Sequence, residues 1–195
     1  MSVPEVQRLR MELAQISQWN IGYFISGFIF WSFVTVIGLL FPVTIARIWW
    51  LVGTFLIFPV AVGASRLLGA DPFSKGNAFG ELVGYTHMSV IGLTFPLVLV
   101  AFFFFPEALL LVMAIAYCVD FYVMTWAFGT RIFGLHAAFR TVAVTVIWFA
   151  FPEWRVLLIP IVVAVAYLVT IVAIPTLRRR WLKLQGDATD VVSAA

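Results

Sequence analysis

Six long apolar runs constrain this sequence more than any other feature. Each holds about the 20 mainly apolar residues that one helix needs to cross the hydrocarbon core of a bilayer. The runs cover residues 20–41, 46–65, 84–105, 108–128, 133–151 and 155–176. Each run must be helical, because an open strand would leave unpaired backbone N–H and C=O groups in lipid. The sequence therefore predicts an all-α, polytopic transmembrane helix bundle of six spans.

The composition agrees with a membrane protein and excludes a soluble domain. Of 195 residues, 64% are hydrophobic and 11% are charged, whereas soluble domains are about half apolar and about a quarter charged. The net charge of +3 does not indicate nucleic-acid binding, because the cations lie in connections and tails, where they set membrane topology. The single cysteine, Cys118, excludes an internal disulfide and is expected to be a buried apolar residue.

The segment before the first span predicts a short amphipathic helix over residues 1–19. Ser2 and Glu5 have the spacing of a capping box, and Pro4 lies in the first turn, where proline is tolerated. An apolar stripe follows at Val6, Leu9, Leu13 and Ile16. We expect this helix to lie on the membrane surface or against the bundle. The first span is too long for the apolar core of a signal peptide, so we expect no cleavable signal.

Lysine and arginine in the connections predict the orientation of the chain. With the N-terminus inside, nine cations fall on the inner side, namely Arg8, Arg10, Arg66, Lys75, Arg131, Arg178, Arg179, Arg180 and Lys183. Only Arg47 and Arg155 fall outside. We therefore predict a multi-pass protein of the plasma (inner) membrane with both termini cytoplasmic. The six-helix domain covers residues 20–177, and residues 178–195 form a basic and then flexible tail, whose Arg178, Arg179, Arg180 and Lys183 bind anionic lipid.

A Phe-Pro pair closes each odd-numbered span, at residues 41–42, 105–106 and 151–152. Proline suits a helix boundary because it lacks a donor N–H and disfavours helix in the residue before it. The recurrence predicts three αα-hairpins inserted in parallel, an arrangement known among membrane bundles. The alternative is that proline is simply common at the ends of spans.

The segments G-F-I-F-W-S-F-V-T-V-I-G-L-L-F-P and L-V-G-T-F-L-I-F-P-V-A-V-G resemble the repeated hairpin of small bacterial six-span membrane proteins. These include the acid-resistance membrane protein family and families of unknown function. The resemblance covers residues 22–66 and implies a six-span fold without a catalytic residue. The loop G-A-D-P-F-S-K-G-N-A-F-G-E-L at 69–82 departs from the tight links of the acid-resistance pattern. It is closer to an uncharacterised family with a Gly- and Asn-containing loop.

Ionisable residues inside the spans are the candidate functional residues, because such residues are costly in lipid and usually face the bundle interior. They are His87, Asp120, His136 and Arg140, with Glu81 at the edge of its span. From the helical rise, Asp120 lies about 12 Å deep, Arg140 roughly 10 Å and each histidine about 5 Å. All fall in the half of the membrane that the topology makes cytoplasmic.

Spans four and five are joined by a short link, so they should be antiparallel neighbours with Asp120 and Arg140 at one depth. We therefore predict an Asp120–Arg140 ion pair. His136 shares a face with Arg140, and Tyr117 shares one with Asp120. Together with His87 these residues form a predicted polar cluster that opens toward the cytoplasm. The alternative is a purely structural pair that fixes helix register, with Arg140 reaching the interface.

No sequence motif assigns an enzyme activity. We find no nucleophile elbow, phosphate-binding loop, dinucleotide fingerprint or H-E-x-x-H, and therefore predict no catalytic residue, metal or cofactor.

The leading hypothesis is a transporter or channel-like bundle, with a water-accessible cavity that reaches Asp120. A stress-related scaffold would instead seal the pair and form homo-oligomers through small-residue surfaces. A lipid-modifying enzyme would have a lateral cleft lined by His87 or His136. The loop at 69–82 is either a connector or a lid.

Overall fold

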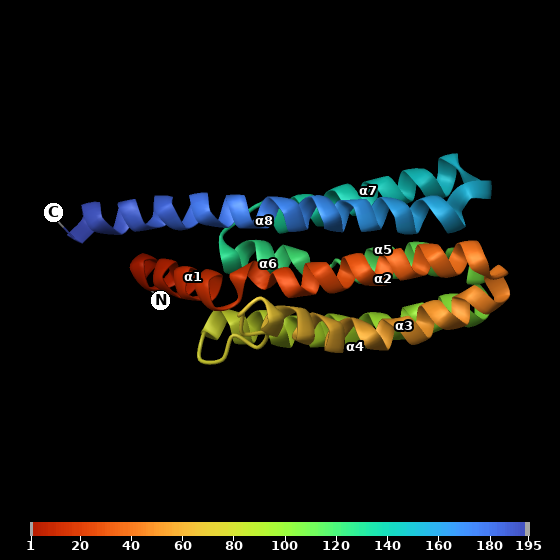
Figure 1. The fold of residues 1–195 in the computed structure, drawn as a ribbon, viewed down its shortest axis with the longest axis horizontal. Helices are drawn as coiled ribbons and strands as arrows, with labels where there is room; N and C mark the ends of the chain where they lie inside the picture. The colour runs from red at the N-terminus through yellow and green to blue at the C-terminus, as the bar shows by residue number, and fades with distance from the viewer. Residues whose placement is uncertain (1, 194–195) are drawn as a thin grey trace.

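The chain is an all-helical bundle, seen here in a computed structural model (Figure 1). The structure describes the backbone of residues 2–193 and the side chains through Leu184. Within that part the α-helices are α1 (Val3–Ile16), α2 (Ile21–Leu40), α3 (Val43–Leu67), α4 (Ala78–Phe104), α5 (Leu109–Ala116), α6 (Phe121–Phe128), α7 (Ile132–Ala150) and α8 (Arg155–Ser193). Short 3-10 turns lie at Gln18–Asn20, Pro106–Ala108 and Pro152–Trp154.

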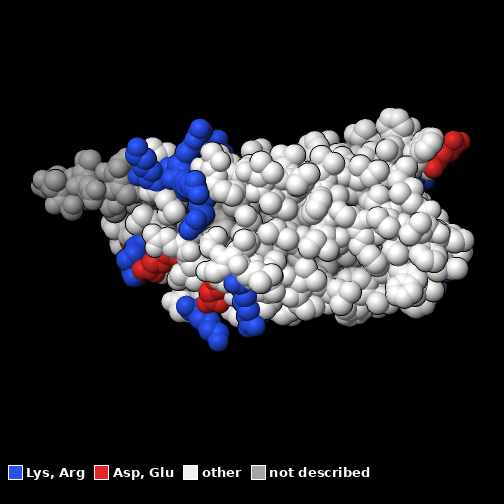
Figure 2. All heavy atoms as spheres, viewed as in Figure 1, with Lys and Arg blue, Asp and Glu red and all other residues white. Residues whose placement is uncertain are grey.

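Six of these segments are long and apolar enough to cross a membrane, with α5 and α6 together forming one of them. They run side by side along the long axis of the molecule (Figure 1). On the face shown in Figure 2, charged side chains gather at one end, few lie at the other, and a broad zone between them carries none. The predicted six-span membrane bundle is confirmed, and the chain is a multi-pass membrane protein.

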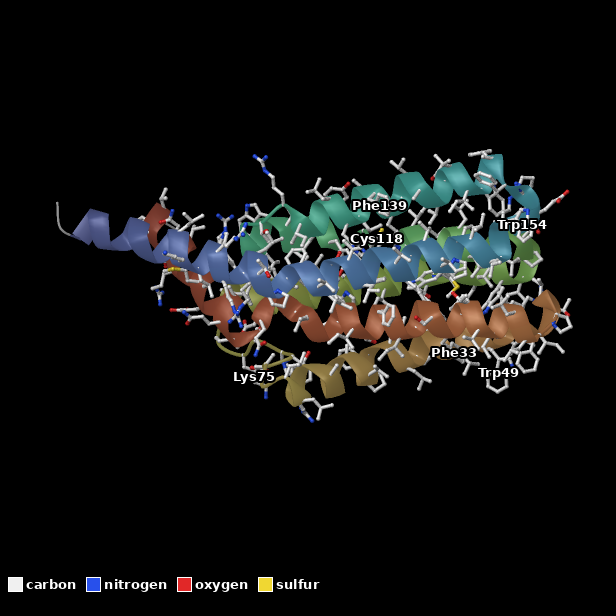
Figure 3. All side chains as sticks on the ribbon, turned by 45° about the horizontal axis from the view of Figure 1, so that its top comes forward. Phe33, Trp49, Lys75, Cys118, Phe139 and Trp154 are labelled. Carbon is white, nitrogen blue, oxygen red and sulfur yellow. The ribbon has the colours of Figure 1, made fainter. Side chains whose placement is uncertain are left out.

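The bundle has two different ends. The end that carries α1, the loop at residues 68–77 and the basic part of α8 is called the α1 end. The opposite end holds the three Phe-Pro turns and is called the Phe-Pro end. Lys75 lies at the α1 end, whereas Trp49 and Trp154 lie at the Phe-Pro end (Figure 3). Tryptophan is favoured at the level of lipid headgroups, so its position marks this membrane boundary.

The three Phe-Pro pairs all form turns at the same end of the bundle (Figure 1). Phe41, Phe105 and Phe151 are the C-caps of α2, α4 and α7, with non-helical backbone angles. Each following proline begins the turn into the next helix, where its missing N–H leaves no bond unmade. The hairpins α2–α3, α4–α5/α6 and α7–α8 therefore point the same way, as the recurrence in the sequence predicts.

The helices pack as an open series of neighbours. Helix α2 packs against α3 and α8, α8 against α7, α7 against α6 and α5, and α4 against α5 and α6. In the described part of the chain, the backbones of α3 and α4 do not pack closely on one another. Long side chains bridge them instead: Phe55 meets Phe95 edge-on at 5.8 Å, and the Arg47 guanidinium lies 5.2 Å from the Phe102 ring. This line of contact is called the α3/α4 seam.

Valine in place of Gly22 is expected to lower the melting temperature of the purified protein. Gly22 lets α2 approach α3, because a Cβ there would lie 2.6 Å from the Ser65 nitrogen and 2.9 Å from the Ala61 oxygen. Such overpacking costs about 1–3 kcal/mol. Gly63→Val is the control, since among the described residues a Cβ at Gly63 meets nothing within 4 Å. Equal melting temperatures for the two variants would contradict this account of the α2–α3 contact.

Helix α1 packs against the bundle, which is one of the two positions that its amphipathic stripe allows. Leu13 is buried, and Val6 and Leu9 pack against the core. The predicted capping box does not form, because the Ser2 side chain makes no capping hydrogen bond. Backbone carbonyls along α1 accept hydrogen bonds from two other segments, the loop at residues 68–77 and α8: Leu9 O from Asn77, Ile16 O from the Asp71 N–H and Ala14 O from Arg178. Helix α1 therefore closes one end of the bundle.

The connection from α1 to α2 is a left-handed turn. Gln18, Trp19 and Asn20 have φ of 49°, 57° and 54°, a conformation that costs non-glycine residues about 1–2 kcal/mol each. The Trp19 side chain is buried and packs edge-on against Phe133 and Trp181, each at 6.0 Å. Burial of this large ring offsets the cost of the turn and fixes α1 in place.

Two boundaries differ from those predicted. Residues 178–195 were predicted to be a basic and then flexible tail, and α8 continues into them through Ser193. The basic run contains good helix formers, and Trp181 packs against Trp19. Residues 194–195 lie outside the described part. Helix α4 begins at Ala78, six residues before the predicted start of its span, because Asn77 caps it by accepting hydrogen bonds from the Phe79 and Gly80 N–H groups.

Candidate functional site

The fourth span is interrupted in the middle of the bundle, a feature that hydropathy does not reveal. Helix α5 ends at Ala116 and α6 begins at Phe121, with turns between them. The Cys118 and Phe121 N–H groups donate three residues back, to Ile115 and Cys118, rather than four. Aspartate favours helix starts over helix interiors, and Asp120 occupies the N-cap position of α6 without making a capping bond. Its carboxylate is therefore free to face a neighbouring helix.

That neighbour is α4, where His87 meets Asp120. His87 Nδ1 lies 2.5 Å from Asp120 Oδ2, so the imidazole and the carboxylate are within hydrogen-bond distance. The Asp120 side chain is 4% exposed and the His87 side chain 23% exposed. Tyr23 from α2 packs edge-on against the His87 ring at 5.6 Å. Asp120 is thus buried, and His87 lies on its more accessible side.

A cavity of about 430 Å³ reaches this pair from the α1 end. Helices α2, α3, α4 and α6 and the loop at residues 68–77 enclose it. Its lining residues are Asn20, Tyr23, Phe58, Pro72, Phe73, Ser74, Gly80, Glu81, Val83, Gly84, Tyr85, His87, Met88, Asp120, Phe121 and Met124. Six of them are also exposed on the outer surface, namely Phe58, Phe73, Glu81, Gly84, Tyr85 and Met88. The cavity therefore opens on the outer surface between Phe58 of α3 and Tyr85 and Met88 of α4, between the α3/α4 seam and the α1 end.

The loop at residues 68–77 covers the cavity and has a defined conformation. The Asp71 carboxylate accepts hydrogen bonds of 3.0 Å from the Phe73 and Lys75 N–H groups. The bond from Phe73 lowers the pKa of Asp71 most; partial burial opposes this, and Lys75 adds to the lowering. Gly69 and Gly76 adopt φ of 71° and 81°, which glycine takes without strain. The loop is thus folded over the site rather than extended away from it.

The predicted Asp120–Arg140 ion pair is wrong. The salt bridges among the described residues are Arg8–Glu12 and His87–Asp120. Arg140 is fully buried and donates a 2.8 Å hydrogen bond to the Tyr167 hydroxyl, with its guanidinium 5.2 Å from the Trp31 ring. The reason lies in α4. His87 is nine residues after Ala78, about 14 Å along the helix, and so is deep enough to take the carboxylate.

Phe121 separates the predicted polar cluster into two groups. Its ring lines the cavity and also contacts the rings of His136 at 5.2 Å and Tyr167 at 6.3 Å. On one side lie His87 and Asp120. On the other side Arg140 meets Tyr167, and His136 Nδ1 lies 2.8 Å from the Thr170 hydroxyl. Only the first group lines the cavity.

The remaining predicted residues divide in the same way. Glu81 lines the cavity and is exposed near its mouth. The Tyr117 hydroxyl donates to Thr54 at 3.3 Å rather than to Asp120. No group of three potential metal ligands occurs within the described residues. The sequence reasoning missed Tyr23, Phe58 and Tyr85, because ordinary aromatic residues in apolar runs carry no signal of which cavity they face.

Comparison with known proteins places this arrangement in a family. The model of a family of unknown function, DUF7010, matches residues 6–176. The chain belongs to that family. The match includes most of α1, the loop over the cavity and both members of the His87–Asp120 pair. No curated protein and no solved structure matches the chain. The expected resemblance to a family of unknown function is confirmed in this form, and nothing links this family member to acid-resistance membrane proteins.

Methionine in place of Arg140 is expected to leave this family member at least as stable as before. Among the described side chains, Arg140 Nε and Nη2 find no hydrogen-bond partner, so methionine removes an incompletely paired buried charge and keeps most of the volume. Arg140→Ala is the comparison and should cost about 2–4 kcal/mol through the cavity that it leaves. Thermal unfolding in detergent measures both. A Met variant as unstable as the Ala variant would show that the guanidinium itself is stabilising.

Proposed function

We propose that this protein is a transporter whose substrate site is the cavity around the His87–Asp120 pair. One observation carries the proposal: a cavity of about 430 Å³ ends on a buried carboxylate at a break in a membrane span. Ionisable residues within spans usually mark substrate or proton pathways. Interrupted spans are a common feature of transporter binding sites.

The chemistry of the pair suits coupled transport. The pair is neutral when the imidazole holds protons on both ring nitrogens and donates the Nδ1 proton to the carboxylate. Loss of that proton leaves one negative charge in a space of low dielectric constant, where an uncompensated charge is costly. Either a proton or a positively charged substrate can therefore neutralise the site, and occupancy by one disfavours binding of the other. Such mutual exclusion is the basis of exchange across a membrane.

The two alternative functions, a membrane scaffold and a lipid-modifying enzyme, predict different sites. A scaffold requires a sealed pair, whereas His87 and Asp120 line a cavity. A lipid-modifying enzyme is supported by one observation, because a carboxylate that orients an imidazole is an arrangement used in general-base catalysis. An enzyme needs access from one side of the membrane only. Access from both sides distinguishes the transporter.

We also propose that the α1 end is cytoplasmic. Nine of the eleven lysine and arginine residues outside the spans belong to this end, which matches the excess of cations in inner-facing loops. Arg179, Arg180 and Lys183 are exposed there and would contact anionic lipid of the inner leaflet. Arg178 is already bonded to α1 and contributes less.

Thiol labelling tests the proposal. In a Cys118→Ala background, single cysteines replace His87, Asp120 or Gly92, and a charged, membrane-impermeant methanethiosulfonate is added to vesicles of either orientation. We expect labelling at positions 87 and 120 from both sides. Gly92 lies on α4 outside the cavity lining and is exposed on the lipid face, so position 92 should remain unlabelled. Labelling of positions 87 and 120 from one side only would support the enzyme, and labelling from neither would support the scaffold.

A further inference from the structure

We infer that the cavity binds lipophilic organic cations, each of which replaces the proton of the His87–Asp120 pair. This inference rests on the proposed transport function and names its class of substrate. Three features support it: the charge of the cavity lining, the aromatic rings around the cavity and the balance of protons in the exchange.

The charge of the cavity favours a cation. Asp120 and Glu81 contribute two carboxylates, and the lining set contains neither lysine nor arginine among the described residues. Lys75 belongs to the covering loop but does not line the cavity, and its charge is balanced locally by Asp71. Arg140 lies behind Phe121 and bonds to Tyr167. An anion entering the cavity would therefore meet like charge, whereas a cation is attracted toward Asp120.

The rings around the cavity favour an organic cation over a metal ion. Five aromatic side chains line it: Tyr23, Phe58, Phe73, Tyr85 and Phe121. Aromatic faces attract cations and accommodate their apolar substituents. Two flexible methionines, Met88 and Met124, complete the apolar wall and can adapt to ligands of different shape. Small metal ions prefer a shell of oxygen ligands, which this wall does not provide, and its volume is typical of organic-ligand sites.

Exchange of one proton for one monovalent cation leaves the net charge of the cavity unchanged. With an imidazolium facing the carboxylate, the pair is neutral. A monovalent cation enters beside Asp120 and the proton leaves His87 for water, so the cavity keeps the same net charge. The other titratable or charged groups that face the pair are Tyr23, Glu81 and Tyr85 at the cavity, and His136, Arg140 and Tyr167 behind Phe121. Because proton and cation compete, affinity should rise with pH by up to about tenfold per unit.

Tetraphenylphosphonium and tetraphenylborate, which share size and shape but differ in charge, test the class of substrate. Calorimetric titration of the full chain in detergent, at about pH 6 and about pH 8, should show tighter phosphonium binding at the higher pH. When the titration is repeated in buffers of different ionisation enthalpy, the change in binding enthalpy should correspond to release of about one proton per bound phosphonium. Asp120→Asn should weaken binding at least about tenfold and remove its pH dependence. Tetraphenylborate should not bind in the cavity.

Matched variants separate the cavity from general partition into detergent. Among the described residues, a Cβ at Gly84 or at Gly92 meets nothing within 4 Å, but only Gly84 lines the cavity. Gly84→Trp should remove phosphonium binding and Gly92→Trp should not. Phosphonium binding that survives both Asp120→Asn and Gly84→Trp would overturn the inference, as would borate binding that Gly84→Trp removes.

The two proposals can fail separately. Labelling of positions 87 and 120 from both sides without selectivity for phosphonium would overturn the inference that the substrate is a cation, but would leave the proposed transport function intact. Selective phosphonium binding with labelling from one side would overturn transport and leave a cation-binding site.

Discussion

Asparagine at position 120 is expected to abolish phosphonium uptake driven by a pH gradient into proteoliposomes. The amide is almost the size of the carboxylate and can still accept a hydrogen bond from His87, but it cannot carry the negative charge that balances a proton or a cation. Loss of one member of a buried charge pair costs roughly 2–5 kcal/mol, so uptake should fall at least about 30-fold, to the level of empty liposomes. Radiolabelled phosphonium provides the measurement.

The carboxylates at the Phe-Pro end provide the control for this result. Glu153→Gln makes the same chemical change at the start of the hairpin turn into α8, far along the chain from the cavity lining. We expect normal uptake from this variant. Both variants should remain folded at the temperature of the uptake assay, because neither creates a cavity. Undiminished uptake by Asp120→Asn would mean that the carboxylate is not the coupling group.

Tryptophan at position 84 should also eliminate uptake, for a steric rather than an electrostatic reason. Gly84 lies at the mouth of the cavity, where there is room for a side chain. Replacement of a helical glycine gains up to about 1 kcal/mol of helix propensity, so the protein should remain folded while the indole fills the cavity. Position 120, converted to cysteine in the same chain, should then resist thiol reagents from the α1 end.

Gly92→Trp places the same side chain two turns further along α4, outside the cavity lining. Normal uptake by this variant would show that the loss at position 84 reflects filling of the cavity rather than a bulky residue on α4. Equal inhibition by both substitutions would instead indicate that α4 must move against lipid, and that the cavity at position 84 is not the substrate site.

The sequence predicted the spans and the Phe-Pro turns because those depend on local chemistry. Proline ends a helix wherever it lies in the bundle, and an apolar run of sufficient length must be helical in lipid. The same reasoning identified Asp120 and His87 as costly residues that need an explanation. It chose the wrong partner for Asp120 because the start of α4 depends on the Asn77 cap, which lies outside the apolar run.

The cavity itself could not be predicted. Its aromatic wall depends on which faces of α2, α3 and α4 turn toward one another, and these helices are apolar on nearly every face. The break before α6 also escaped prediction, since Tyr117–Asp120 has no proline or glycine to signal it. The one sequence feature that could have indicated the break is the lone Asp120 in an apolar run. Its N-cap position in α6 explains both the break and the direction of its carboxylate.

The opening of the cavity between α3 and α4 has a consequence for how a ligand would reach the site. Because Phe58, Tyr85 and Met88 border the mouth and are exposed toward lipid, an amphiphile would arrive from the membrane phase, where it is already concentrated by its partition coefficient. Apparent affinity measured against the aqueous concentration would then increase with lipophilicity among cations that fit equally well. Occupancy of the site would be set by the composition of one leaflet.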